Sequence, residues 1–375
     1  MDQRYRPQAL RQSGGSAVRD AFHNQVLYCR SNDAPVTARI LDALLAALHR
    51  ADGNPFLTRI RDWAGPPLAD ALPLRAAGGL HSLHLAGTEP TLATIYRGEP
   101  ADDAAVVADV VARRWADLLP WLDGPPQTNE AGRSANFVAA LLWLADRGLP
   151  PRFEGLEIGS SAGINLMLDR YRYDLGGVRV GPEAAALAFA PEWRGPPPPA
   201  RAIAFESLKG CDVAPVDMSD PAQALRLKAY AWPEHTVRFA RIEAAVEAAR
   251  VASPDLVAMN AADFVETALA CPQVEGVTRV LLHSIVWQYV PAGERARVTA
   301  AMVAAAARAT PGRPLAWVAV ETNRATHVHE LTVQYWPGGE QRVQLAVAHA
   351  HGAWIEWLDP PVPSDWPAGE RLLPG

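Results

Sequence analysis

The sequence predicts an α/β protein with a doubly wound, mostly parallel sheet and a helical region before it. Three observations support this prediction. Residues 153–163 have the pattern of a buried strand that breaks into a small-residue turn, after which helical spacing begins. From there to residue 320, short apolar runs alternate with helical segments, as expected for parallel strands with helices on both faces. The first 150 residues show mainly helical spacing.

We expect residues 1–150 to form a helical unit. Apolar residues recur at helical spacing in three of its segments, namely 38–48, 104–122 and 137–145. The motif Gly148-Leu-Pro-Pro151 ends the last of these helices, because proline cannot continue a helix. We therefore place a domain boundary near residue 150, with 1–150 as a cap over the substrate and 151–375 as the α/β domain.

Five short apolar segments are predicted to be the parallel strands, at 153–158, 203–205, 256–259, 279–283 and 315–320. Helices are predicted between them, starting at Asp220-Pro221 and then over 234–250, 263–269 and 291–309. The proline-rich segment 174–201 is predicted to be an insertion with turn structure. Strands at 331–336 and 342–348 flank Pro337-Gly-Gly339, so the sheet should end in an antiparallel hairpin.

Composition and charge exclude several classes of protein. A net charge of −6 argues against nucleic acid as a partner, because phosphate binding requires a basic surface. The widely separated Cys29, Cys211 and Cys271 exclude a disulfide framework and a cysteine zinc site, and they fit a reducing compartment. The N-terminus lacks a signal-peptide pattern, and no apolar run is long enough to span a membrane. We therefore expect a cytoplasmic protein with no membrane partner.

The turn after the first strand is the most informative feature of the chain. In the motif Glu157-x-Gly159-x-Ser161-x-Gly163, small residues follow a buried strand and leave room for a ligand against bare backbone. A carboxylate two positions before the first glycine would repel a pyrophosphate, but it can pair with the ammonium of an amino-acid moiety. The alternative is an ordinary small-residue turn between a strand and a helix.

Polar residues also follow the next strands along the chain, at Asp212, Asn260, Asp263, His283 and Ser284. In a doubly wound sheet the ligand lies beyond the carboxyl ends of the strands, where the strand order reverses. These residues are therefore candidate ligand contacts. The alternatives are a turn aspartate for Asp212 and a helix N-cap for Asp263.

The fourth strand ends in a polar and aromatic cluster that includes His283, Ser284, Trp287 and Tyr289. A polar side chain on so apolar a strand carries a desolvation cost unless it is paired. His283 and Ser284 should therefore have partners or a ligand. A satisfied core histidine is the alternative for His283.

These strand ends are similar to the motifs of class I S-adenosylmethionine-dependent methyltransferases, which have a Rossmann-like fold. The resemblance implies S-adenosylmethionine as the cofactor, with Asp212 at the ribose and Asn260 or Asp263 at the adenine amino group. The implied cofactor-binding residues are Glu157, Gly159, Ser161, Gly163, Asp212, Asn260, Asp263 and Ser284. Ser161 stands where the family usually has glycine, and Asn260 stands where it usually has an acid.

The whole chain also resembles an uncharacterised bacterial family, a domain of unknown function with a methyltransferase-like core. This resemblance rests on residues 127–134, 157–172, 210–212 and 283–291. It implies the fold and brings no activity with it.

The polar cluster QTNEAGRS, which begins at Gln127, precedes an apolar helix. The functional interpretation places Asn129, Glu130 and Arg133 at the substrate mouth, facing His283 and Trp287, because the segment lies shortly before the first strand. Helix capping together with a surface ion pair is the alternative.

Four histidines near the C-terminus suggest a metal site. His327 and His329 would share one face of a strand, as would His349 and His351, and the hairpin would bring position 327 near 349. Imidazoles in such an arrangement can bind a transition metal. No cysteine lies nearby, and hairpin ends often carry solvated histidines, so we predict no metal site.

The leading hypothesis is a methyltransferase that acts on a small molecule. Methyl transfer is an in-line displacement, so alignment and desolvation can supply most of the catalysis. His283 or Tyr289 would be the base if the acceptor must lose a proton. The alternatives are a non-catalytic ligand- or partner-binding protein with the same fold, and a nicotinamide-dependent oxidoreductase. Against the latter, Glu157 crowds the phosphate site and no Gly-x-Gly-x-x-Gly motif occurs. The acceptor and the oligomeric state remain open.

Overall fold

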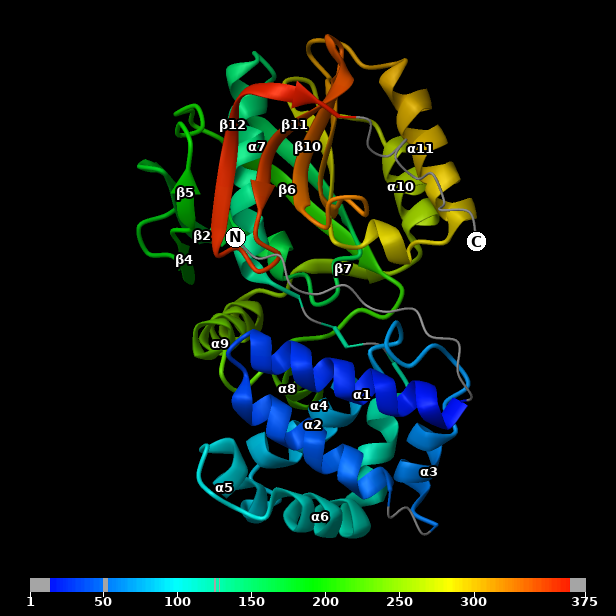
Figure 1. Cartoon of the computed structure of the whole chain (residues 1–375). Helices are drawn as coiled ribbons and strands as arrows, with labels where there is room; N and C mark the ends of the chain where they lie inside the picture. Colours follow the sequence, from blue (N-terminus) through cyan, green and yellow to red (C-terminus); the bar gives the residue numbers. More distant parts are fainter. Residues whose placement is uncertain (1–13, 50–52, 125, 128, 365–375) are drawn as a thin grey trace. The chain divides into compact units, whose positions relative to one another are not determined.

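The computed structural model describes residues 14–49, 53–124, 126–127 and 129–364 (Figure 1). The chain divides into two compact units. The helical unit contains the described part of 1–128 together with 220–243, and the sheet unit contains 129–219 and the described part of 244–375. The boundary therefore precedes Asn129 instead of falling near residue 150, and the helical unit is built from two separate stretches of chain. The role of the N-terminal region as a substrate cap stays a prediction.

Helices make up the regular structure described for the helical unit (Figure 1). The α-helices are α1 (Gly14–Ser31), α2 (Pro35–Leu48), α3 (Pro55–Arg61), α4 (Leu72–Leu85), α5 (Ala93–Tyr96), α6 (Asp103–Leu118), α8 (Pro221–Ala229) and α9 (Thr236–Val251), whose first half belongs to this unit. The short 3₁₀ helices η1 (Pro90–Leu92) and η2 (Leu119–Leu122) join them. The helices predicted at 38–48 and 104–122 are confirmed as α2 and as α6 with η2. Neither here nor in the rest of the described chain is a helix both long and apolar enough to cross a membrane.

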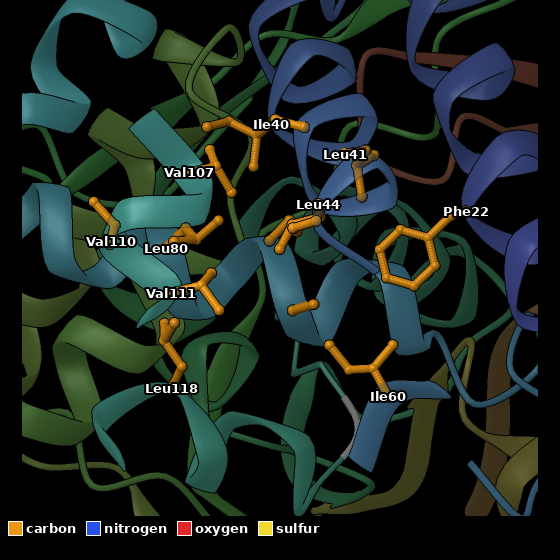
Figure 2. Close-up of a cluster of buried hydrophobic side chains, with 14 of the residues drawn as sticks. Phe22, Ile40, Leu41, Leu44, Ile60, Leu80, Val107, Val110, Val111 and Leu118 are labelled. Carbon is orange, nitrogen blue, oxygen red and sulfur yellow. The ribbon is translucent and has the colours of Figure 1, made fainter. Parts of the chain in front are cut away.

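The apolar faces of these helices meet in one core, part of which Figure 2 shows. Phe22 of α1, Leu44 of α2 and Leu80 of α4 are fully buried there. Val107 and Val111 of α6 complete the same cluster (Figure 2). The core therefore joins helices from the whole length of the N-terminal segment.

The segment 220–243 is held to the N-terminal helices by polar and packing contacts. Glu234 accepts hydrogen bonds from the backbone N–H and the hydroxyl of Thr37, both at 2.8 Å. The ring nitrogen Nδ1 of His81 lies 3.0 Å from the carbonyl oxygen of Ala229. A Cβ atom at Gly78 would lie 2.7 Å from the ring of Tyr230, so only glycine permits this approach.

The sheet unit contains a nine-stranded sheet in the order β5-β12-β11-β10-β9-β8-β1-β6-β7. Its strands are β1 (Arg152–Ile158), β5 (Glu192–Arg194), β6 (Ala204–Asp212), β7 (Asp255–Ala258), β8 (Thr278–Ser284), β9 (Leu315–Thr322), β10 (His329–Trp336), β11 (Gly339–Ala348) and β12 (Trp354–Pro363). Pairing is parallel from β7 to β9 and between β12 and β5, and it is antiparallel between β9, β10, β11 and β12. The predicted mostly parallel sheet and its C-terminal hairpin are confirmed.

Strand order reverses at β1. From β1 the chain continues to β6 and β7 on one side, and then to β8 and β9 on the other side. Because β1, β6, β7, β8 and β9 are parallel, their carboxyl ends share one edge of the sheet. A reversal of this kind leaves a crevice at that edge in doubly wound sheets.

Cross-strand pairs assign side chains to the two faces of the sheet, because paired residues share a face. Leu156 pairs with Leu281, and Leu281 pairs with Trp317. All three belong to the apolar cluster beneath α10 (Ala261–Ala270) and α11 (Ala292–Ala306), which we call the α10/α11 face.

Glu157 lies on the opposite face. It pairs with Leu282 of β8. The same face of the sheet continues across β9 to β10, where it includes Tyr335. The Tyr335 ring lies 6.0 Å from that of Trp143 in α7 (Ser134–Asp146), so we call this the α7 face. Helices therefore cover both faces, as predicted.

The prediction of an α-helix directly after the turn that follows β1 is wrong. A kinked 3₁₀ segment, η4 (Ile164–Arg170), stands in its place. The hydroxyl groups of Tyr171 and Tyr173 donate to the carbonyl oxygens of Ile164 and Leu168, which are the acceptors that an α-helix would need.

The proline-rich insertion has regular structure that the sequence did not predict. A small sheet in the order β3-β2-β4 is formed by β2 (Tyr171–Leu175), β3 (Val178–Val180) and β4 (Leu187–Phe189). The next strand, β5, pairs with β12 at the edge of the main sheet. The prediction also missed β12 itself.

Replacement of Leu44 by alanine should lower the free energy of unfolding by about 2–5 kcal/mol, because it leaves a cavity in the core of the helical unit. Leu27→Ala is the matched control, since Leu27 lies on α1 with 41% of its surface exposed. Urea denaturation followed by circular dichroism measures both. Equal losses in the two variants would contradict the core described here.

Candidate functional site

The turn between β1 and η4 has an unusual backbone. Gly159, Ser161 and Gly163 have φ angles of +67°, +54° and +71°. The conformation of Ser161 is disfavoured for a residue with a side chain, and two hydrogen bonds hold it. Its N–H donates to Oδ2 of Asp212 at 2.9 Å, and its carbonyl accepts from the N–H of Val216 at 3.0 Å.

The carboxyl group of Glu157 is buried beside this turn, with 2% of the residue exposed. Its Oε1 accepts a hydrogen bond from the Asn165 amide at 3.0 Å. Its Oε2, Oδ1 of Asn165 and Oγ of Ser161 are buried oxygens with no hydrogen-bond partner among the described residues. Such atoms are costly unless a donor reaches them. The arrangement therefore suits a ligand that carries several N–H groups.

Burial raises the pKa of Glu157 from 4.5 to about 7. The Asn165 amide, the Ser160 hydroxyl and the charge of Arg133 act in the opposite direction. A cationic ligand would favour the ionised carboxylate further.

Asp212 ends β6 and joins two turns. Its Oδ2 accepts from Ser161, and its Oδ1 accepts from the N–H of Ala214 at 2.9 Å. The turn-aspartate alternative therefore describes its contacts, while its place at the ribose stays a prediction. Each carboxylate oxygen keeps a second lone pair for a further donor.

The segment Asn129–Arg133 belongs to the sheet unit and contacts two loops at the carboxyl ends of the strands. The Asn129 amide donates to the carbonyl oxygen of Ser160. Nε of Arg133 donates to the carbonyl oxygen of Ala350 at 2.8 Å, in the turn between β11 and β12. Glu130 is buried with 1% exposed, and its Oε1 accepts from the N–H of Gly132 in the 3₁₀ turn η3 (Ala131–Arg133). These side chains are thus part of the site's framework, and substrate contact stays a prediction.

His283 is fully buried on the α10/α11 face. Its Nδ1 lies 2.7 Å from Oε1 of Glu321, and its Nε2 accepts from the indole N–H of Trp317 at 3.0 Å. The ring also stacks on Trp287 at 5.2 Å between centroids. This is the arrangement of a satisfied core histidine, because both ring nitrogens have protein partners.

Glu321 was not among the predicted site residues. Its Oε1 also accepts from the backbone N–H groups of Val286 and Trp287 at 3.1 and 3.2 Å, so it holds the loop after β8. An acid that directly follows the predicted strand 315–320 was the available signal. Asn165 was missed as well, because nothing in a helical pattern distinguishes it.

Asn260 and Asp263 form a helix cap. Oδ1 of Asn260 accepts from the N–H of Asp263 at 2.9 Å and caps α10. The carboxylate of Asp263 pairs with Arg297 at 2.7 Å. Asn260 is thus the cap instead of Asp263, and a contact of either residue with adenine stays a prediction.

The remaining predicted residues of β8 and its loop differ in exposure. Ser284 pairs with Val320 and lies on the α7 face, nearly buried. Trp287 is buried against His283, whereas 73% of Tyr289 is exposed in the 3₁₀ turn η5 (Trp287–Tyr289). Tyr289 therefore does not line a buried site in this conformation, and its role as a base is not proposed further.

The prediction that the C-terminal histidines share strand faces in pairs is wrong. His327 has a φ of +59° in the turn before β10, which begins at His329, and His329 pairs with Ala348. His349 and His351 lie in the turn after β11, with ring centroids 5.6 Å apart. Across the described ranges, no three or more His, Cys, Asp or Glu side chains are placed to hold a metal ion.

The predicted site residues thus reach one edge of the sheet on two different faces. Asn129–Arg133, Glu157, Asp212 and Ser284 lie together on the α7 face. His283 and Trp287 lie on the α10/α11 face with Glu321. The segment Asn129–Arg133 therefore neighbours Glu157 instead of facing His283 and Trp287.

The stability of the protein should fall between about pH 4.5 and pH 7 through Glu157. The native carboxyl group binds its proton more tightly than the unfolded one, so its contribution is present below about pH 4.5 and lost as the pH rises through about 7. The change should amount to roughly 3 kcal/mol, and Glu157→Gln should abolish it.

Urea unfolding at about pH 5 and about pH 8 measures this dependence. Glu247→Gln is the control, because Glu247 is exposed on α9 and should leave the fall unchanged. An identical fall in Glu157→Gln would show that another group causes it.

Comparison with known proteins gives one match. A bacterial family described as "Uncharacterized protein conserved in bacteria (DUF2332)" matches residues 19–357. No curated protein and no solved structure matches the chain. The match covers most of the chain, including the turn after β1, the segment Asn129–Arg133 and the loop after β8. The resemblance to an uncharacterised bacterial family is therefore confirmed, and the chain belongs to the family described as DUF2332.

Proposed function

We propose that this protein is an S-adenosylmethionine-dependent methyltransferase that acts on a small molecule. The carboxyl group of Glu157 carries the proposal, because it is buried at the carboxyl end of β1 with one oxygen that no described residue hydrogen-bonds. An ammonium supplies both the charge and the N–H donors that such a carboxylate lacks. The amino-acid moiety of S-adenosylmethionine ends in an ammonium of this kind.

The strand order supports the proposal. The parallel strands β7-β6-β1-β8-β9 reverse their order at β1, and the turn that contains Gly159 and Gly163 follows that strand. Doubly wound sheets, the methyltransferase-like fold among them, bind their ligands at this point. The shared edge brings Glu157, Asp212 and Ser284 into one region of the α7 face.

The residues of this region fit S-adenosylmethionine in part. Glu157, Asn165 and Ser161 would hold the amino-acid end through their unsatisfied oxygens. Asp212 would accept from the ribose with the lone pairs that its turn contacts leave. When bound, the cofactor supplies a methyl carbon made electrophilic by a sulfonium. The protein's part is to orient both reactants and exclude water.

Two contacts favour a second candidate function, that of a non-catalytic binding protein. The Ser161 N–H is already bonded to Asp212, and a Cβ at Gly159 would lie 2.2 Å from Cγ2 of Val286. Part of the backbone that a nucleotide would approach is therefore occupied. A smaller ligand that carries an ammonium, such as a free amino acid, would still satisfy Glu157.

Calorimetric titration of the whole chain with S-adenosylmethionine, S-adenosylhomocysteine and NAD⁺ distinguishes these functions. Glu157→Gln should weaken S-adenosylmethionine binding about ten-fold or more, because a charged hydrogen bond contributes roughly 1.5–3 kcal/mol. Glu154→Gln is the matched control, since Glu154 lies on the same strand but pairs with Arg279 on the α10/α11 face.

Equal affinity in wild type and Glu157→Gln would contradict the assigned ammonium contact. Binding of a free amino acid without S-adenosylmethionine would favour the non-catalytic function. Binding of NAD⁺ alone would overturn both.

Asp212→Ala should also weaken S-adenosylmethionine about ten-fold or more, through loss of the ribose contact. Asp212 also holds the Ser161 turn, so part of this loss could arise from the backbone. S-adenosylhomocysteine and methionine should be titrated in parallel, because only the former has a ribose. If a folded Asp212→Ala variant binds the nucleoside ligands with unchanged affinity, Asp212 only holds the turn and does not contact the ribose.

A further inference from the structure

The loop after β8 fills the open side of the glycine that directly follows β1. Gly159 has a φ of +67°, and a Cβ atom on it would lie 2.2 Å from Cγ2 and 2.8 Å from Cβ of Val286. Val286 is partly exposed and packs at the border of the apolar cluster beneath α10 and α11. Its side chain therefore occupies the place where a ligand would meet the bare backbone of Gly159.

The backbone of this loop is strained. Ile285 has a φ of +50°. A β-branched residue rarely adopts this left-handed conformation, because its Cβ crowds the backbone. Of the residues other than glycine that the structure describes with a positive φ, Ile285 is the only β-branched one. Strain of this kind persists only where surrounding contacts hold it, and it is common at ligand sites and switches.

Contacts with the end of β9 hold the loop in this conformation. The N–H of Ile285 donates to the carbonyl oxygen of Val320 at 2.8 Å. Oε1 of Glu321 accepts from the N–H groups of Val286 and Trp287 at 3.1 and 3.2 Å. Trp287 is buried, with 4% of its surface exposed. The loop is therefore anchored at Trp287, whereas Ile285 and Val286 are strained or partly exposed.

The turn after β1 also directs its N–H groups to protein acceptors. The N–H of Ser160 donates to the carbonyl oxygen of Cys211 at 2.9 Å, and that of Gly163 donates to the carbonyl oxygen of Ser160 at 2.7 Å. The N–H of Ser161 donates to Asp212 at 2.9 Å. The turn thus has the contacts expected of a closed form, in which protein groups occupy the surface that a ligand would use.

We propose that Ile285 and Val286 form a gate over this turn, and that S-adenosylmethionine binds when Val286 moves away from Gly159. This inference rests on the proposed function. The hydrogen bonds to Glu321 stabilise the closed gate, and the backbone conformation of Ile285 destabilises it. A ligand that binds only the open form shifts the balance between the two forms. Its apparent affinity is then reduced in proportion to the fraction of open molecules.

The first experiment removes the two methyl groups that lie beside Gly159. Val286→Ala should bind S-adenosylmethionine and S-adenosylhomocysteine on the order of ten-fold more tightly than the wild type, because the closed form loses packing contacts. Calorimetric titration of the whole chain measures the affinity, and stopped-flow mixing should show faster association. A purely structural role predicts the opposite sign, because the turn would lose support and bind more weakly. Val303→Ala is the matched control on α11, with 60% of Val303 exposed, and should leave binding unchanged.

The second experiment changes the strain and leaves Val286 in place. Asparagine adopts the left-handed conformation at little cost, whereas alanine does not. Ile285→Asn should therefore keep the gate closed and bind S-adenosylmethionine about five-fold more weakly than Ile285→Ala. Both variants lack the isoleucine side chain, so the comparison isolates the backbone. Equal affinities would show that strain at Ile285 does not control binding, which overturns the gate.

The outcomes separate the two proposals. If the wild type binds either ligand and Val286→Ala binds it equally or more weakly, the gate is overturned and the proposed function stands. If neither ligand binds to the wild type or to Val286→Ala, both proposals are overturned. Binding that occurs in Val286→Ala and is absent in the wild type supports both. Circular dichroism checks that each variant is folded, and if Val286→Ala does not fold, the comparison of the two Ile285 variants decides.

Discussion

The side chains of β1 alternate between the two faces of the sheet, and this alternation determines the environment of Glu157. Leu156 and Ile158 complete the apolar cluster beneath α10 and α11, so the residue between them must point to the α7 face. β1 is an internal strand with a neighbouring strand on each side. Water therefore reaches the carboxyl group of Glu157 less easily than it would reach a side chain on an outermost strand. The Asn165 amide, the segment Asn129–Arg133 and the turn held by Asp212 all gather around this one buried acid. A polar framework of this kind is the response expected when the fold itself buries a charge.

At the carboxyl ends of the parallel strands, the polar side chains on the two faces of the sheet differ in how completely they are hydrogen-bonded. On the α10/α11 face, His283, Trp317 and Glu321 satisfy one another, and Glu321 also holds two backbone N–H groups of the loop after β8. On the α7 face, Glu157 and His329 keep atoms without partners among the described residues. Hydrogen-bond satisfaction thus distinguishes a supporting network from a candidate site, although each face carries a histidine and an acid.

The periodic parts of the fold could be predicted from the sequence because they depend on burial alone. The helices around residues 38–48 and 104–122, the parallel strands and the hairpin at Pro337 all follow from apolar spacing and turn residues. The insertion at 174–201 could not be predicted, since its strands are short and their pairing is non-local. The candidate site could be outlined from the sequence through Glu157 and Asp212, because both residues lie at strand ends. His329 was considered only as a metal ligand, because its contact with Thr322 comes from the pairing of β9 with β10 in the folded chain.

The helical unit is discontinuous in sequence, and this has a consequence for the order in which the protein can fold on the ribosome. Its core helices α1 to α6 are synthesised first, but Glu234, Tyr230 and Ala229, which complete its packing, follow only after β1 and β6 have been made. The nascent helices therefore stay incompletely covered while α7 and β1 to β6 are synthesised, of which β1 and β6 are the first two strands of the parallel block. Those strands in turn lack β8 and β7, their neighbours on either side, until translation has passed the inserted segment. Each unit is completed only after part of the other unit has been synthesised. The two units therefore cannot fold strictly one after the other during translation, as two continuous domains could.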